Sequence, residues 1–431
     1  MNLPVRLGRM RLILQCLLLG AALADPACAA GPELSLEDAV RLAGAQSPRI
    51  AATQSQLRAA RERAIAAGQR PDPVLKAGIN NLPVTGPDRY STTQDFMTMR
   101  SIGVMQEFTR ADKLQARGER ATREAELAAT GEQQVRADVQ RDAALAWLER
   151  SFRESERALL DQQLAHDTLQ VQAAEALYRG GKGAQADVFA ARGALELTRD
   201  RIAQAERQIA VATTMLGRWI GIDAQRSSAP RPELRPPGWT GADLVLHLTA
   251  HPQVAFAAGQ EALANAEADV ARANRRSDWS VELMYSQRGP SYSNMVSVNV
   301  SIPVQWDRGQ RQDRELAAAL AQRERAAAER DDMLRAHEAE VRAMLEEWRS
   351  DEERLSRYHA SLVPLARQRT EAALAAYRGA TGPLAAVIEA RRGETQTQLD
   401  RLAIEMDIAR LWARLTFLIP VAPSGATGSA R

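Results

Sequence analysis

The residues best able to do chemistry are five histidines and one turn that contains glycine and lysine. The histidines are scattered along the chain: His166, His247, His251, His337 and His359. Residues 337–341 read His-Glu-Ala-Glu-Val and lack the second histidine of a zinc-binding helix. Residues 180–183 read Gly-Gly-Lys-Gly, without the spacing or the Ser or Thr of a phosphate-binding loop. We therefore predict no enzyme activity, no catalytic or metal site and no cofactor.

Three methionines form another group with ligand chemistry. Met97, Met99 and Met105 lie within nine residues of one another, and thioether sulfur is a soft ligand suited to Cu(I) or Ag(I). One hypothesis is that this segment contacts a soft cation during export. The alternative is that these side chains pack or face lipid, since methionine readily fills apolar surface.

Composition indicates long helices. Of 431 residues, 45% are hydrophobic but only 4% are aromatic, and alanine, the best helix former, is abundant. This argues against an all-β protein and against an α/β enzyme with a large buried sheet. The 56 basic residues nearly balance the 54 acidic ones, which gives no charge surplus for binding nucleic acid.

The N-terminus reads as an export signal. Residues 1–29 combine three early arginines with an apolar run, residues 12–24, that is too short to span a bilayer. The only cysteines are Cys16 and Cys28, so we expect no internal disulfide. Cys28 is either removed with the leader or carries a lipid. No later run of about 18 apolar residues predicts a membrane helix.

The rest of the chain repeats itself once. We predict one repeat over 33–222 and a second over 240–419, joined by a proline-rich linker at 223–239 and followed by a disordered tail at 420–431. Capping residues at 35–38 and 240–243 open the two repeats. Residues 177–188 and 376–387 form matching turns that contain glycine. Each repeat reads as two short helices, two strands, a long helix, a turn and a final helix.

Four segments alternate apolar and polar residues, as strands with one face of each kind do. They are about 73–81, 101–108, 279–287 and 295–304. Nine or ten residues suffice for a tilted strand to cross a bilayer. Four strands cannot close a barrel, so membrane insertion would need several chains. The alternatives are a hairpin that covers a soluble core and a periplasmic coiled-coil scaffold without a barrel.

Two segments without proline, 111–178 and 310–363, predict very long helices. At about 1.5 Å per residue the first approaches 100 Å. Their apolar residues form narrow stripes at coiled-coil spacing, which predicts antiparallel partner helices across the turns. The stripes are Val135, Val139, Ala143 and Ala146, then Leu334, Val341, Leu345, Trp348 and Leu355, then Leu399, Leu402, Met406, Ala409 and Ala413.

This order of elements resembles TolC-like outer-membrane efflux proteins over residues 33–419, and residues 80–108 resemble the heavy-metal branch of the CzcC and CusC type. The resemblance implies a mainly helical fold with a small β part. Long antiparallel hairpins form a periplasmic α-barrel, and a homotrimer forms a twelve-stranded outer-membrane barrel. It also implies a passive exit duct in lipid, joined by a periplasmic adaptor to an inner-membrane RND pump. The cargo is heavy-metal cations, or alternatively drugs or proteins of type I secretion.

The resemblance places the adaptor-docking tip at the two turns, with Gly181, Lys182, Asp187, Gly379 and Gly382. Termination of the helices is the alternative role of these glycines. Relatives often have two acids just after the second turn as a gate. Glu389 matches the second acid, but Ala386 occupies the first position. Tyr377, Arg378 and Arg391 are the residues expected to complete the gate, or else they are solvated helix surface.

Overall fold

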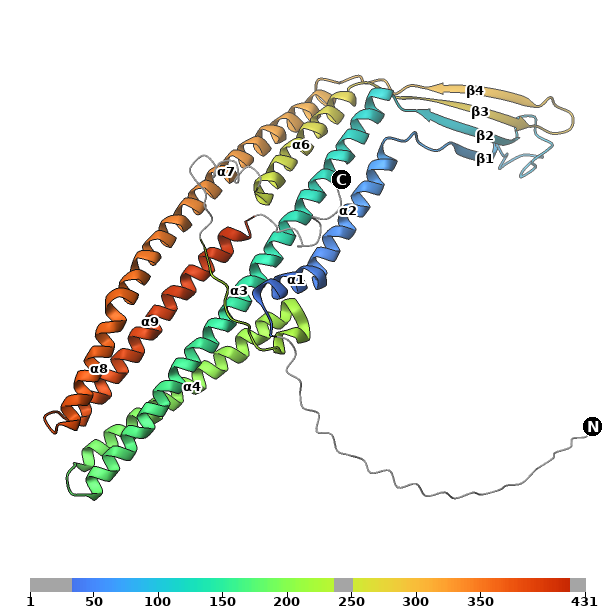
Figure 1. Ribbon diagram of the computed structural model, residues 1–431. Coiled ribbons are helices and arrows are strands. Elements are labelled where there is room, and N and C mark those ends of the chain that lie inside the picture. The colour runs from blue at the N-terminus through green and yellow to red at the C-terminus, as the bar shows by residue number, and fades with distance from the viewer. Residues whose placement is uncertain (1–32, 236–250, 419–431) are drawn as a thin grey trace, which may run out of the picture.

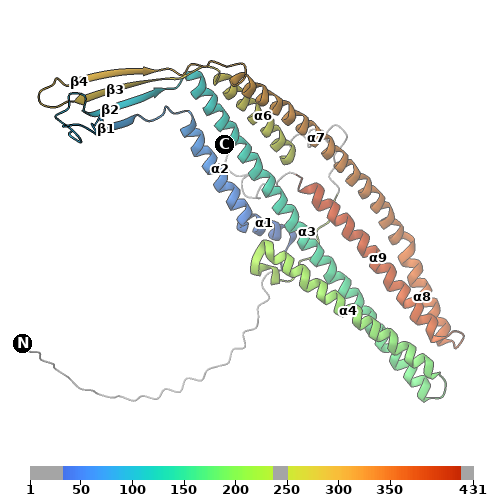
Figure 2. The same cartoon turned by 180° about the vertical axis from the view of Figure 1, so that it is seen from behind.

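The computed structural model describes residues 33–235 and 251–418. Long helices run side by side, a four-stranded sheet projects from one end of them, and two helical turns lie at the opposite end (Figure 1, Figure 2). The first repeat contains α1 (Leu36–Gln46), α2 (Pro48–Ala67), β1 (Val74–Asn80), β2 (Met99–Phe108), α3 (Ala111–Arg179), α4 (Gln185–Ile220) and η1 (Gly221–Gln225). The second contains α6 (Pro252–Ala273), β3 (Trp279–Gln287), β4 (Met295–Ser301), α7 (Gln312–Arg357), η2 (Tyr358–Leu362), α8 (Val363–Arg378) and α9 (Leu384–Thr416).

Local sequence sets where the short helices begin. The hydroxyl of Ser35 accepts a hydrogen bond from the backbone N–H of Asp38 and caps α1, as the capping residues predict. Pro48 and Pro252 open α2 and α6, because the first helical position needs no N–H donor. His251 caps α6 by accepting a hydrogen bond from Gln253.

The sheet is antiparallel with the strand order β1-β2-β3-β4. Both outer strands, β1 and β4, therefore have one edge with no partner strand among the described residues. β2 begins two residues earlier than predicted. β4 ends at Ser301 instead of reaching residue 304, because Pro303 has no N–H to donate to a ladder.

The two long helices, α3 and α7, are as long as predicted, and we call them the rods. α3 has 69 residues and is unbroken. α7 has 46 residues and continues through a single π-helical turn, η2, into α8. Pro364 lies in the first turn of α8, and a wide turn before it accommodates the missing N–H.

Small apolar clusters replace a single large core. One cluster surrounds Trp147, whose indole N–H donates to the carbonyl of Leu34 at 2.9 Å, and another surrounds Trp348. Apart from Leu399, the residues of the predicted stripes lie in or against these clusters, with Val139, Ala143, Val341, Ala409 and Ala413 fully buried. A third cluster joins the two turns at the far end.

The leader with Cys28, the capping residues at 240–243, part of the linker and the tail lie outside the described residues. Within them, residues 226–235 continue from η1 without a helix. None of the described helices combines the length and the apolar character needed to cross a membrane.

Candidate functional site

The sheet has one face covered with exposed apolar side chains. Across the four strands, Leu75, Val104, Leu283 and Val298 lie opposite one another in one row. Their exposed fractions range from 47% for Val104 to 70% for Leu75. An exposed apolar band of this kind marks a surface made for lipid or for another protein.

The other face of the sheet is polar. The ammonium of Lys76 on β1 lies 2.8 Å from the carboxylate of Glu282 on β3, and the amide of Asn80 donates to the hydroxyl of Ser101 at 2.9 Å. Between them Gly103 faces Met284, and a Cβ on Gly103 would come within 2.7 Å of the carbonyl oxygen of Leu283. Glycine is therefore required at this crossing of β2 and β3.

The sheet does not gather the three methionines. Met99 and Met105 lie on one face of β2 but six residues apart, which is about 20 Å along a strand. Met97 precedes the strand and is 47% exposed. These three side chains therefore cannot coordinate one ion together.

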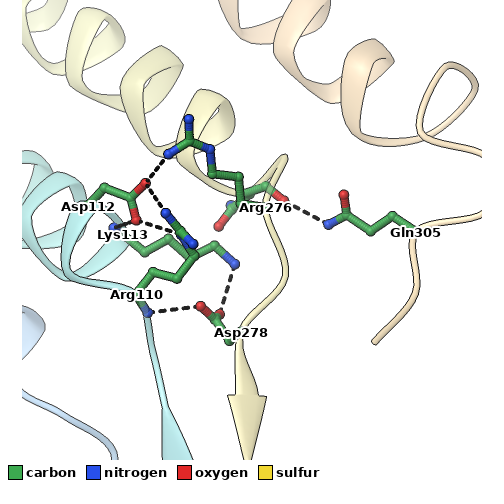
Figure 3. Close-up of polar contacts among 7 residues, drawn as sticks. Arg110, Asp112, Lys113, Arg276, Asp278 and Gln305 are labelled. Atoms are coloured by element: carbon green, nitrogen blue, oxygen red, sulfur yellow. Dashed lines mark hydrogen bonds and ion pairs between the residues drawn. The ribbon is translucent and has the colours of Figure 1, made fainter. Parts of the chain in front are cut away.

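A polar network fixes the angle between the sheet and the rods (Figure 3). The carboxylate of Asp278, just before β3, accepts from the backbone N–H of Arg110 at 3.0 Å and from the ammonium of Lys113 at 2.8 Å. The Lys113 and Asp278 side chains are only 8% and 16% exposed. Partial burial raises the pKa of Asp278, but the Lys113 ammonium and the Arg110 N–H lower it by more, so the group is ionised.

The same network contains a second carboxylate. Asp112 on α3 lies 3.1 Å from Arg110 and 3.2 Å from Arg276, which follows α6 (Figure 3). These contacts join the first repeat to the second exactly where strands turn into helices. No pattern in the sequence predicted this network, although each of its two aspartates stands beside an element boundary.

The two turns at the far end have the same backbone geometry. Lys182 N–H donates to the carbonyl of Leu177 at 2.9 Å, and Thr381 N–H donates to Ala376 at 2.9 Å. The left-handed residue is Gly181 in the first turn, with φ +69°, but Ala380 in the second, with φ +57°.

The glycines of the second turn therefore act differently from the expected left-handed termination. Gly379 caps α8 with φ −77°. Gly382 permits close approach, because a Cβ there would lie 3.1 Å from the Cβ of Ala376. Among the other expected tip residues, Lys182 is exposed and Asp187 is half-buried at the start of α4.

The structure brings one pair of the expected tip and gate residues together. Burial raises the pKa of the Tyr377 phenol, and the nearby carboxylate of Asp187 raises it further. The Tyr377 hydroxyl is buried and has no hydrogen-bond partner among residues 33–235 and 251–418. The remaining gate residues are not gathered: Arg391 pairs along its own helix with Glu394 at 3.4 Å, and Glu389 and Arg378 are exposed on different helices.

An apolar cluster closes the far end between the hairpins. It combines Ala174 of α3 and Val188 of α4 with Leu384 and Val387 of α9, each less than 10% exposed. The tips of the two repeats are therefore held together by apolar packing.

Two of the five histidines form a buried pair. The rings of His251 and His337 lie 4.4 Å apart between centroids, and the side chains come from the start of α6 and from α7. Burial, then the neighbouring His337 and Arg141, lower the pKa of His251 to about 4, and burial also lowers the pKa of His337. Within residues 33–235 and 251–418, no group of three His, Cys, Asp or Glu is arranged to hold a metal ion.

Comparison with known proteins identifies the architecture. Residues 39–221 match the family described as Outer membrane efflux protein, whereas no curated protein sequence matches the chain significantly. Crystal structures of CusC share the fold with a TM-score of 0.75 and 16% identity, over 89% of this chain and 91% of that one.

Two further solved structures share it. A membrane protein from Pseudomonas aeruginosa has a TM-score of 0.75 and 17% identity, over 89% of this chain and 93% of that one. The outer membrane protein VceC from Vibrio cholerae has a TM-score of 0.70 and 17% identity, over 88% and 96%. Residues 39–221 are thus similar to the outer membrane efflux protein family, and the two repeats together share the fold of these solved structures.

Proposed function

We propose that this protein is an outer-membrane efflux protein, the homotrimeric exit duct of a tripartite pump, and that it passively conducts heavy-metal cations. The observation that carries the proposal is the sheet. It has an exposed apolar face, a polar face and two open edges, and it stands at the end of rods about 100 Å long. Open edges in lipid leave backbone groups unpaired, whereas copies joined edge to edge close a barrel.

Three copies supply twelve strands, enough for a barrel with an open lumen lined by the polar face. The same closure places the rods side by side as a tunnel in the periplasm. The proposal assigns no energy-consuming step to this chain, so direction comes from an inner-membrane RND pump, coupled through a periplasmic adaptor.

The turns are the proposed docking tip for the adaptor, through Gly181, Lys182, Asp187, Gly379 and Gly382. The gate is proposed to open when the hairpins separate, which breaks the apolar cluster at the tip and moves Tyr377 away from Asp187. Such opening is a shift between two helix packings. Arg378, Glu389 and Arg391 then line the opened tip, where their charges would meet the passing cargo.

Support for metal cations comes from the resemblance of residues 80–108 to the heavy-metal branch. The second candidate cargo is drugs, or proteins of type I secretion, because the TolC-like resemblance covers both repeats and is not confined to that segment.

Tolerance of a deletion strain, compared with the strain complemented by the intact gene, tests the function. The panel is Cu, Ag, Co, Zn, Cd and several hydrophobic antibiotics. Sensitivity restricted to one group of metals is the expected result. Sensitivity to antibiotics alone contradicts the metal assignment but keeps the duct, and unchanged tolerance to everything contradicts both.

A further inference from the structure

The two strand pairs of this chain have the same register. In β1 and β2, Val74 lies opposite Met105; in β3 and β4, Ser280 lies opposite Ser301. The helices before β1 and β3 end alike, since Gln69 N–H donates to Ala66 and Arg275 N–H donates to Arg272. When the ends of α2 and α6 are superposed, Val74 of β1 becomes equivalent to Ser280 of β3. Their partners across each strand pair, Met105 of β2 and Ser301 of β4, are then equivalent too, so the two strand pairs superpose residue by residue.

The contact between the hairpins can be carried over to the open edges. β2 and β3 meet with Val104 opposite Leu283. Their equivalents are Val300 on β4 and Ala77 on β1. If β4 of one copy meets β1 of a second copy as β2 meets β3, Val300 lies opposite Ala77 of the second copy.

Side-chain size independently favours this register. Where Gly103 of β2 lies opposite Met284 of β3, there is no room for a Cβ on Gly103. The equivalent pair at the open edges is Asn299 with Gly78. A glycine again faces a larger residue, and within the single chain a Cβ on Gly78 would meet nothing closer than 4.0 Å. Gly78 is therefore unexplained by its own chain and explained by a neighbouring strand.

The charged residues at the starts of α3 and α7 support the same register. Residues 110–113 read Arg-Ala-Asp-Lys and residues 311–314 read Arg-Gln-Asp-Arg. In each segment the backbone N–H of the fourth residue donates to the carbonyl of the first at 3.1 Å. Arg314 is thus the equivalent of Lys113, and Asp72 is the equivalent of Asp278. Arg314 and Asp72 are both exposed and carry no ion pair to any described residue.

We propose that the second repeat of one copy docks on the first repeat of the next in this register, with Val300 opposite Ala77 and Arg314 paired with Asp72 of the second copy. The inference rests on the proposed function, because it requires copies side by side in a ring. It specifies the interface that the ring uses, which the two repeats of each chain already display internally.

Cysteine cross-linking of the full-length protein in outer membranes tests the register. Asn80→Cys combined with Ser297→Cys places thiols on directly opposed residues of the polar face. Asn80→Cys with Met295→Cys, and Asn80→Cys with Asn299→Cys, shift the pair by two residues either way and are matched controls. Oxidation is expected to link copies of the first variant at least about fivefold more than either control. Stronger linking in a control, or none in any variant, overturns the register.

Two further variants test the side-chain arguments in the same membranes. Gly78→Val is expected to abolish detergent-resistant assemblies, whereas Gly193→Val, at an exposed position of α4 where a Cβ would meet nothing within 4 Å, retains them. Asp72→Arg is expected to weaken assembly, and Asp72→Arg with Arg314→Asp to restore it. Retained assembly with Gly78→Val, or no restoration by the charge exchange, contradicts the interface. Metal tolerance is scored separately, so that a correct interface with unchanged tolerance contradicts only the proposed function.

Discussion

His251 shows how one side chain can serve two purposes. Its ring nitrogen accepts a hydrogen bond from Gln253 N–H at 3.2 Å and caps α6, while the ring packs on His337. Only a neutral imidazole nitrogen can accept that bond. The groups nearby are Arg141 on α3, His337 on α7 and Glu340, whose carboxylate lies 3.5 Å from His337. Cap formation at this site is therefore linked to pH.

We expect stability to fall as pH drops from about 6.5 to about 4. In this range an unfolded His251 binds a proton but the folded one does not, because its pKa is lowered to about 4. The loss is on the order of 2–3 kcal/mol. His251→Asn retains a capping oxygen without titrating and should reduce the slope of melting temperature against pH. An unchanged slope would show that His251 titrates normally.

Ala380 carries backbone strain that its equivalent Gly181 does not. Left-handed φ disfavours alanine, so Ala380→Gly is expected to stabilise the protein by about 1 kcal/mol, and Gly181→Ala to destabilise it similarly. Ala372→Gly, at an exposed position inside α8, is the control and should destabilise by about 1 kcal/mol. Chemical denaturation measures all three, and a destabilising Ala380→Gly refutes the strain.

At the scale of elements, the Lys113–Asp278 ion pair joins the start of helix α3 to the start of strand β3. Asp278→Asn leaves a largely buried ammonium without its counter-charge and is expected to cost roughly 2–4 kcal/mol. Asp269→Asn is the control: it removes an ion pair whose side chains are more than half exposed, so it should cost less than about 0.5 kcal/mol. Equal unfolding free energies for the two variants would refute a structural role for the pair.

The elements were predictable because their signals are local. Alternation of apolar and polar residues along 279–287 predicts a strand, and the absence of proline from 111 to 178 predicts a long helix. Features that depend on two distant segments were not predictable. The hydrogen bond from the Lys113 ammonium to the Asp278 carboxylate and the proximity of Asp187 to Tyr377 arise only when the two repeats pack together. The π-helical turn before Pro364 and the left-handed Ala380 are local exceptions to residue preference.

At the scale of the whole molecule, the proposed gate predicts that closure of the duct depends on the apolar cluster at the tip. Val387→Asp places a charge at a position that is 2% exposed, so the hairpins should separate. We expect increased entry of a large hydrophilic antibiotic into cells, measured as at least about fourfold greater sensitivity. Ala385→Asp, at an exposed position in the same turn of α9, is the matched control and should leave antibiotic sensitivity unchanged. Equal sensitivity of the two variants would show that the cluster does not hold the tip closed.

The length of α3 has a mechanical consequence. The helix is anchored at one end by the network around Asp278 and carries a turn at the other. A stiff rod of about 100 Å acts as a lever, so a tilt of roughly 5° at the anchor displaces the turn by about 9 Å. Small rearrangements beside the sheet are thus amplified into large displacements at the distant tip. Conversely, a small force applied at the tip exerts a larger force at the anchor beside the sheet.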